Sequence, residues 1–397
     1  MPFAPHYLDT PDAVDKFLDG IEATRAIAID TEGASFHRFV DRIYLLQLST
    51  ATQTAVIDPL PIGTPAPLGR LLEDRGVEVV LHDADYDLRL LRQDYGWQVT
   101  NVFDTRVAAQ LLGIRSFGLA ALLEQFFAIK LDKRHQRADW SMRPLTADML
   151  DYAAQDTHHL LALRDRLHDL LAQKERLAWA REEFQRLEGT RWDPEPETDG
   201  FLRIKGARDL TRRELALLRE LVPWRDGIAR TLDRATFRVA SNDVLLELSR
   251  QAPRTREAAM RVKGMPRNLT EARTTELLDA IARGLAVPDA ELPRFPRAPR
   301  WDRDPDFDDR VGRLKGARDA VALGLDLDPG VLCSRDRLEA IARARPTSLE
   351  ALIDLPGMRR WQAEVLGDPL LRALGSGKAM PATAPGKTLG ESPYRDT

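Results

Sequence analysis

The first half of the chain alternates short apolar runs with longer amphipathic runs. Four short runs are rich in leucine and β-branched residues and predict buried strands at residues 26–30, 43–49, 55–58 and 77–82. Six longer runs place apolar residues every three or four positions and predict helices at residues 11–20, 66–74, 87–95, 106–112, 119–127 and 147–186. This order predicts an α/β domain in which helices flank a sheet.

Two segments without apolar periodicity divide the rest of the chain. Residues 188–199 are rich in proline, glycine and acids, and residues 287–300 are rich in proline. Such compositions are typical of linkers. We therefore expect domains at residues 1–198, 203–286 and 301–374, followed by a tail at residues 375–397 that is too poor in large apolar residues to fold.

The two C-terminal helical regions form an internal repeat with an offset of 93 residues. Matching residues are Arg225–Asp226 with Arg318–Asp319, Asp243 with Asp336, Pro253 with Pro346, Gly264–Met265 with Gly357–Met358, and Arg267 with Arg360. A repeat of this length predicts two copies of one small unit. Each copy should consist of several short helices with a glycine turn near its end.

Composition narrows the class of protein. There is one cysteine, so no internal disulfide framework forms, and no apolar stretch approaches the roughly 20 residues of a membrane helix. The N-terminal residues lack the pattern of a signal peptide, and we expect a cytosolic protein. The net charge of -4 argues against coating nucleic acid through overall positive charge, so any such binding must be local.

Asp30 and Glu32 lie at the end of the first predicted strand. Strand periodicity places both carboxylates on one side of the sheet, while Thr31 between them faces the other side. This spacing alone is weak evidence for a functional site, because 62 acids in 397 residues give about ten acid-x-acid pairs by chance. An exposed pair at a strand end is the plainer alternative.

Asp87 lies where the fourth predicted strand passes into a helix. Asp83 or Asp85 would cap this helix, and Asp87 in its first turn is favoured by the helix dipole. Asp87 could instead project toward the carboxylates at the strand end. This segment alone does not decide between the two readings.

Tyr152 and Asp156 lie in a later segment with strong helical periodicity. Their spacing of four puts the hydroxyl and the carboxylate on one helical face, about one turn apart. A half-buried tyrosine beside a solvated aspartate would show the same spacing.

The order of these three motifs resembles the DEDDy exonuclease pattern, and the segments around them resemble ribonuclease D and its relative in the eukaryotic nuclear exosome. The resemblance rests on DTEG at residues 30–33, FDT at residues 103–105 and WSMRPL at residues 140–145, which leads into YAAQD. The two repeated units resemble HRDC domains. The resemblance implies an α/β, ribonuclease H-like exonuclease domain with a mixed sheet flanked by helices, followed by two all-α HRDC-like domains.

The resemblance also implies a reaction, 3′–5′ hydrolysis of single-stranded RNA to nucleoside 5′-monophosphates. Its catalytic residues would be Asp30, Glu32, Asp87, Tyr152 and Asp156. Asp30, Glu32 and Asp156 would hold one divalent ion and Asp30 with Asp87 a second, either Mg²⁺ or Mn²⁺, because carboxylates suit such hard ions. Tyr152 would orient the attacking water. The implied substrates are transfer RNA precursors in a bacterial cytoplasm, with no membrane and no obligate protein partner.

Weaker candidates for substrate contacts are Phe36, His37, His82, Lys133, Arg137 and Arg143. Phe36 and His37 could stack on the terminal base or ribose, and the basic residues could contact phosphates. A structural histidine and a solvated basic loop are the alternatives. Two other functions stay open: an exonuclease acting on DNA, and a catalytically weak RNA-binding platform.

Overall fold

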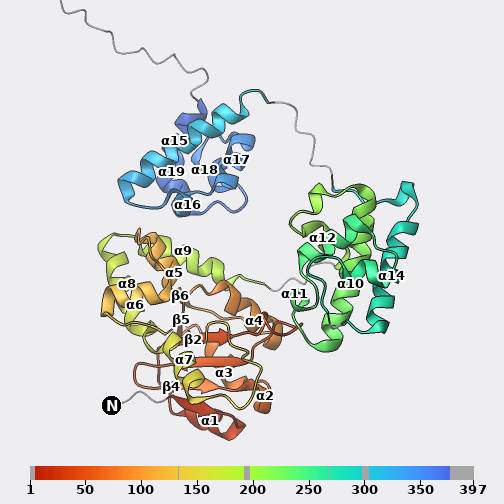
Figure 1. Cartoon of the computed structure of the whole chain (residues 1–397). Helices are drawn as coiled ribbons and strands as arrows, with labels where there is room; N and C mark the ends of the chain where they lie inside the picture. Colours follow the sequence, from red (N-terminus) through yellow and green to blue (C-terminus); the bar gives the residue numbers. More distant parts are fainter. Residues whose placement is uncertain (1–4, 133, 192–196, 268, 297–303, 376–397) are drawn as a thin grey trace, which may run out of the picture. The chain divides into compact units, whose positions relative to one another are not determined.

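The computed structural model describes residues 5–132, 134–191, 197–267, 269–296 and 304–375 (Figure 1). Its contacts separate two compact units, Met1–Asp302 and Arg303–Thr397. The predicted disordered tail lies outside the described residues except for Gly375, the last residue of a helix. The domain boundaries proposed from the sequence stay predictions.

The N-terminal domain is built on one six-stranded sheet. The strands are β1 (His6–Leu8), β2 (Ala26–Glu32), β3 (Leu45–Ser49), β4 (Thr54–Ile57), β5 (Glu78–Leu81) and β6 (Val102–Asp104). They lie in the order β1-β4-β3-β2-β5-β6. Strand β3 is antiparallel to β2 and β4, and the other neighbours are parallel, so the predicted mixed sheet is confirmed.

The four predicted strands are present, and two further strands were not predicted. β1 and β6 have three residues each, which is too short for a periodic pattern to stand out. β2 continues two residues beyond its predicted end, to Glu32. This extension keeps Asp30 and Glu32 in the same strand geometry.

Helices cover both faces of the sheet. In this domain they are α1 (Pro11–Asp19), α2 (Pro59–Ile62), α3 (Ala66–Glu73), α4 (Asp85–Tyr95), α5 (Thr105–Leu111), α6 (Leu119–Phe127), α7 (Ala147–His158), α8 (Leu160–Gln173) and α9 (Leu177–Glu188). The apolar faces of α1, α3 and α4 pack with side chains from one side of the sheet in one core. On the other side α7 packs on β2, β3 and β4.

The single helix predicted for residues 147–186 is wrong, because the structure has α7, α8 and α9 there. His159 separates the first two. Glu175, between α8 and α9, has a left-handed φ of 57°, which ends the hydrogen-bonding pattern of α8. The apolar periodicity runs on across both breaks, so the sequence pattern did not reveal them.

The two predicted helical units are present. The first comprises the 3-10 helices η1 (Glu197–Arg203) and η2 (Ala207–Asp209), then α10 (Arg212–Leu232), α11 (Thr236–Val239), α12 (Asn242–Gln251), α13 (Arg256–Met260) and α14 (Glu271–Ala286), and the short η3 (Asp289–Glu291) follows it. The second comprises α15 (Phe307–Leu325), α16 (Pro329–Leu332), α17 (Arg335–Ala344), α18 (Leu349–Ile353) and α19 (Arg360–Gly375).

The 93-residue register extends to backbone detail. Asp233 and Asp326 both end the first long helix of their unit with a left-handed φ. Ser241 and Ser334 both cap the third helix by accepting a hydrogen bond from the backbone three residues on. The predicted glycine turns are Gly264 and Gly357, with φ of 89° and 78°.

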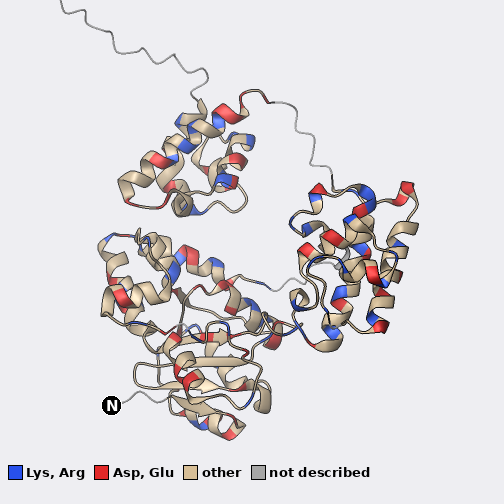
Figure 2. Cartoon of the chain, viewed as in Figure 1, with Lys and Arg blue, Asp and Glu red and all other residues tan. Residues whose placement is uncertain are grey.

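Both acidic and basic residues occur along the helices of both units (Figure 2). Across the described ranges, no helix combines the length and apolar character needed to cross a membrane.

Candidate active site

Three of the predicted acids meet at one point of the N-terminal domain. Asp30 and Glu32 project from the same face of β2, as strand alternation requires. Asp156 lies on α7, the helix that packs against this face. One carboxylate oxygen from each of the three lies within 4.8 Å of the others. The arrangement can hold a cation between a strand and a helix.

Asp87 lies beside this cluster, on the first turn of α4, and is buried. Its Oδ1 accepts hydrogen bonds from Thr31, from the side-chain hydroxyl and from the backbone N–H at 3.2 Å. Thr31 therefore faces away from Asp30 and Glu32, as expected, and on its own side holds Asp87. The sequence pattern gave Thr31 no such role.

The predicted cap of α4 is wrong. The helix begins at Asp85 after Ala84, with no side-chain cap, and Asp83 adopts a left-handed φ of 65°. The stabilising carboxylate is Asp104, at the end of β6. It accepts hydrogen bonds from the N–H groups of Asp83 and Ala84 at 3.3 and 2.8 Å, and it also caps α5. Asp104 thereby fixes the helix that carries Asp87.

The electrostatics of the cluster favour positive charge. Burial, and then the charge of neighbouring acids, raises the pKa of Asp30, Glu32 and Asp87 well above the ordinary range. The same causes, burial first and then Asp87, raise the pKa of Asp156 to about 7. Four acids that repel one another in a partly desolvated site fit hard divalent cations, which take oxygen ligands.

Tyr152 lies one turn before Asp156 on α7. Its ring stacks on Trp140, with centroids 6.0 Å apart, and His135 contacts it edge-on at 5.7 Å. Burial and the charges of Asp156, Glu32 and Asp30 raise the pKa of the phenol far above neutral pH. Tyr152 is therefore a neutral hydrogen-bond donor next to the acids.

Phe36, four residues after Glu32, is 50% exposed. The guanidinium of Arg137 lies 5.6 Å from its ring centroid, and Phe237 on α11 lies edge-on at 6.4 Å. The His37 Nε2 lies 3.1 Å from the Arg137 carbonyl, and its Nδ1 lies 3.2 Å from the Arg238 guanidinium and 3.6 Å from Asp139. Phe36 and Arg137 are thus accessible, whereas His37 holds the loop.

Two of the weaker candidates have structural partners. Arg143 pairs with the buried Asp58 through two of its nitrogens and donates to the carbonyls of Trp140, Met142 and Tyr44 at 2.7, 2.8 and 2.9 Å. His82 shares a hydrogen bond of 2.9 Å with Thr105, and burial lowers its pKa to about 4. These contacts favour structural roles for both. Lys133 lies outside the described residues.

Arg143→Met is expected to lower the free energy of unfolding by about 3 kcal/mol, because it leaves the buried Asp58 without its cation. Although burial acts to raise the pKa of Asp58, hydrogen bonds from Arg143 and Tyr7 lower it below the ordinary range, so this carboxylate is charged at neutral pH. Urea unfolding measures the loss. The double variant with Asp58→Asn should recover part of it, and the folded Arg143→Met variant should keep the kcat/KM of the wild type. A loss of kcat/KM without a loss of stability would instead make Arg143 a substrate contact.

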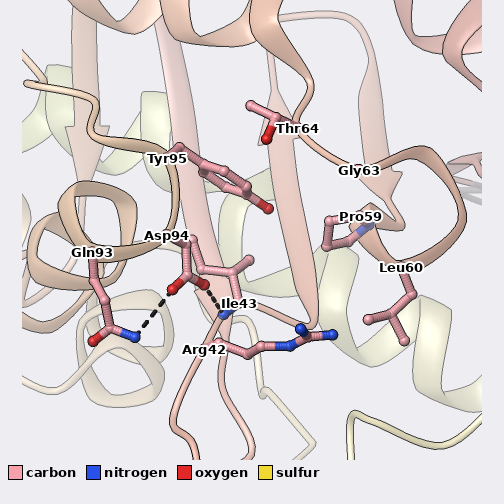
Figure 3. A pocket seen from close by; sticks show the side chains of 9 residues that line it. All are labelled: Arg42, Ile43, Pro59, Leu60, Gly63, Thr64, Gln93, Asp94 and Tyr95. Atoms are coloured by element: carbon pink, nitrogen blue, oxygen red, sulfur yellow. Dashed lines mark hydrogen bonds between the residues drawn. The ribbon is translucent and has the colours of Figure 1, made fainter.

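A separate pocket of about 470 Å³ is lined by none of the candidate catalytic acids (Figure 3). Its lining includes Arg42, Tyr95 and one carboxylate, Asp94. Asp94 accepts a hydrogen bond from the Ile43 N–H at 2.7 Å and another from Gln93 at 3.0 Å. These bonds order the start of β3, and the pocket offers no cluster of ligands or nucleophiles.

Comparisons with known proteins match both the N-terminal domain and the two helical units. A family model described as 3′–5′ exonuclease matches residues 5–172, and the HRDC domain model matches residues 214–281 and 307–374. Ribonuclease D from Acidiphilium cryptum is 30% identical over 95% of this chain and 95% of its own length.

Solved structures extend the likeness over nearly the whole chain. A protein from Bifidobacterium adolescentis matches with a TM-score of 0.81 and 25% identity, over 94% of this chain and 97% of its own. Escherichia coli RNase D, described as an exoribonuclease involved in structured RNA processing, matches with a TM-score of 0.70 and 25% identity, over 94% and 99%. The resemblance inferred from the sequence is confirmed: the chain belongs to the ribonuclease D family of 3′–5′ exoribonucleases, with an exonuclease domain followed by HRDC domains.

Proposed function

We propose that this protein hydrolyses single-stranded RNA from its 3′ end and releases nucleoside 5′-monophosphates, with Asp30, Glu32, Asp87, Tyr152 and Asp156 as catalytic residues. The observation that carries the proposal is the convergence of Asp30, Glu32 and Asp156 within 4.8 Å, with Tyr152 one helical turn from Asp156. Asp87 joins them from a third element.

The acids would hold two Mg²⁺ or Mn²⁺ ions, one between Asp30, Glu32 and Asp156 and one between Asp30 and Asp87. When bound, such ions supply an acidified water and charge stabilisation at the leaving 3′ oxygen. The protein supplies the geometry: β2 fixes two carboxylates, α7 brings the third, and Thr31 with Asp104 fixes Asp87 and its helix.

Tyr152 orients the attacking water by a hydrogen bond. Since its pKa is raised, the phenol keeps its proton at neutral pH and does not act as a general base. Stacking on Trp140, which is 1% exposed, holds the ring in place. Tyr152 thus contacts the attacking water directly and holds it in position.

Tyr152→Phe is expected to reduce kcat roughly 100-fold, the scale of a misplaced reactant, and to leave Mn²⁺ affinity unchanged. Single-turnover degradation of a labelled RNA measures the first quantity and calorimetry the second. Tyr95→Phe is the matched control, because Tyr95 lines a pocket that contains none of the catalytic acids. Equal rates for Tyr152→Phe and the control would remove the proposed role.

Phe36 and Arg137 would bind the 3′ end of the RNA beside the acids. Base stacking on an exposed ring is worth about 1 to 3 kcal/mol per base and tolerates any sequence. No carboxylate of the described residues forms a salt bridge with Arg137, so its charge is available to a phosphate. His37 would act indirectly, by holding the loop.

Transfer RNA precursors in the bacterial cytoplasm are the substrates that family membership suggests. The two HRDC domains would guide single-stranded 3′ ends toward the acids. Their helices carry both arginines and acids (Figure 2), so this contact would be local and sensitive to salt.

Purified protein incubated with 5′-labelled RNA and with its DNA counterpart tests the proposal, with Mg²⁺, with Mn²⁺ and with EDTA. A ladder that shortens from the 3′ end only with metal, and faster on RNA, is the expected result. Equal rates on DNA would move the function to a DNA-directed exonuclease. No shortening of either strand would leave an RNA-binding platform.

A further inference from the structure

Gln47 on β3 is a buried amide without partners. Its side chain is 0% exposed, and within the described residues neither Oε1 nor Nε2 has a hydrogen-bond partner. An unpaired polar group of this kind costs about 1 to 3 kcal/mol. An apolar side chain of similar size would remove that cost, so we expect the amide to have a function other than packing.

The strand register places Gln47 next to the catalytic acids. In the antiparallel pair of β2 and β3, Gln47 lies directly opposite Asp30. Residues paired in this way share a face of the sheet, with Cβ atoms about 4.5 to 5.5 Å apart. Gln47 and Asp30 are therefore side-chain neighbours.

The packing on either side of the sheet identifies that face. Leu46 and Leu48, which flank Gln47 in β3, belong to the core on the other side of the sheet. Ser49, two residues on, shares a hydrogen bond of 2.8 Å with Thr157 of α7. The amide of Gln47 is thus enclosed between the sheet and the helix that carries Asp156.

The chemistry of the amide complements what surrounds it. Carboxylates that bind a cation are ionised and only accept hydrogen bonds, so Asp30, Glu32 and Asp156 would supply no donor of their own once a cation is bound. The Nε2 of glutamine carries two protons. Carboxylates that bind metal ions are themselves held by hydrogen bonds from such neighbours, and loss of the neighbour typically weakens metal affinity or activity by about 10- to 100-fold.

We propose that Gln47 is a positioning residue: its Nε2, which has no partner within the described residues, donates a hydrogen bond to the Asp30 carboxylate once the divalent cation is bound and holds that side chain in its ligating orientation. This inference rests on the proposed metal-dependent function. Gln47 touches neither the RNA nor the reacting atoms. It acts through Asp30, so its removal should change the affinity for metal more than the rate at saturating metal.

The test is Gln47→Leu in the full-length protein, with Mn²⁺ alone as the titrant in calorimetry. The expected result is a Kd for Mn²⁺ that rises about 10- to 100-fold, together with a higher unfolding temperature in EDTA, because the unpaired amide is gone. In RNA degradation, the Mg²⁺ concentration for half-maximal rate should rise by the same factor, and kcat at saturating Mg²⁺ should change less than the metal affinity.

Gln362→Leu is the matched control. Gln362 on α19 is 4% exposed; its Oε1 also lacks a partner within the described residues, while its Nε2 donates to the Val331 carbonyl at 3.3 Å. Its replacement removes a comparable buried amide in the second unit, away from the acids in sequence, and should leave the Kd for Mn²⁺ unchanged. If Gln47→Leu does not fold, Gln47→Met, which fills the site with a flexible side chain of similar length, takes its place.

An unchanged Kd for Mn²⁺ in a folded Gln47 variant would overturn the proposal, and so would a wild-type protein that binds no Mn²⁺. A lower unfolding temperature in EDTA with unchanged Mn²⁺ affinity would make Gln47 a purely structural amide. If the wild type binds Mn²⁺ but degrades no RNA, the proposed function fails. A higher Kd for Mn²⁺ in the Gln47 variant would still support the role of Gln47.

Discussion

Asp30→Asn is expected to lower the rate of RNA hydrolysis at least about 1,000-fold. Asp30 is the one acid assigned to both proposed ions, so its loss removes charge stabilisation worth several kcal/mol from both the attacking and the leaving oxygen. The asparagine keeps the volume of the side chain and removes a charge from a crowded acidic site, so the fold should persist. Single-turnover degradation of labelled RNA, with circular dichroism of the same sample, measures both effects.

Asp151→Asn is the control for this variant. Asp151 is exposed on α7, next in sequence to Tyr152, and belongs to no group of possible metal ligands among the described residues. Its replacement makes the same chemical change without touching the proposed ligands and should keep the wild-type rate. Substantial activity in Asp30→Asn would reject the assignment of this residue to the metals.

The metal-free protein is expected to lose stability as pH rises from 5.5 to 8. Asp156 has its pKa raised to about 7 in the folded chain and an ordinary, lower pKa when unfolded, so the folded state holds the proton more tightly. Stability from this group is therefore present at low pH and falls as the carboxyl ionises. Over this range Asp156 alone accounts for about 2 kcal/mol.

Thermal unfolding in EDTA at several pH values measures this slope. Asp156→Asn should flatten it, since the asparagine cannot ionise, and Asp151→Asn should retain it. Saturating Mg²⁺ or Mn²⁺ should reverse the trend, because the ions bind the ionised acids. Metal-free stability that rose over the same pH range would contradict the mutual repulsion of these carboxylates.

Local patterns predicted much of the fold. The four longer strands, the repeat and the glycine turns each leave a signal within a few neighbouring residues, and all are present in the structure. The three-residue strands β1 and β6 leave none. The sequence pattern also missed the division of the predicted helix at residues 147–186 into α7, α8 and α9. The apolar positions of these three helices continue in the same periodicity.

In the site, too, residues with a local sequence pattern could be predicted, whereas contacts between residues far apart in the sequence could not. Asp30, Glu32 and Asp156 could be named from their spacing and their order along the chain. Partners that meet only after folding could not: Arg143 finds Asp58 85 residues away, and Thr31 reaches Asp87 56 residues away. Asp104 carried a weak local signal, as an aspartate immediately before a helix, but its bond to Ala84 depends on the sheet order.

The two helical units in the C-terminal half of this chain correspond to each other at an offset of 93 residues, as two copies of one sequence would. Arg225 and Arg318 each bond the aspartate that follows them, at 2.8 and 2.9 Å, and then diverge, one reaching the Asn242 side chain and the other the Cys333 carbonyl. A duplicated ancestor would explain the shared contact, and later specialisation the difference. Equivalent substitutions in the two copies can therefore separate inheritance from adaptation: what both copies require maintains the fold, and what one copy alone requires belongs to its own task.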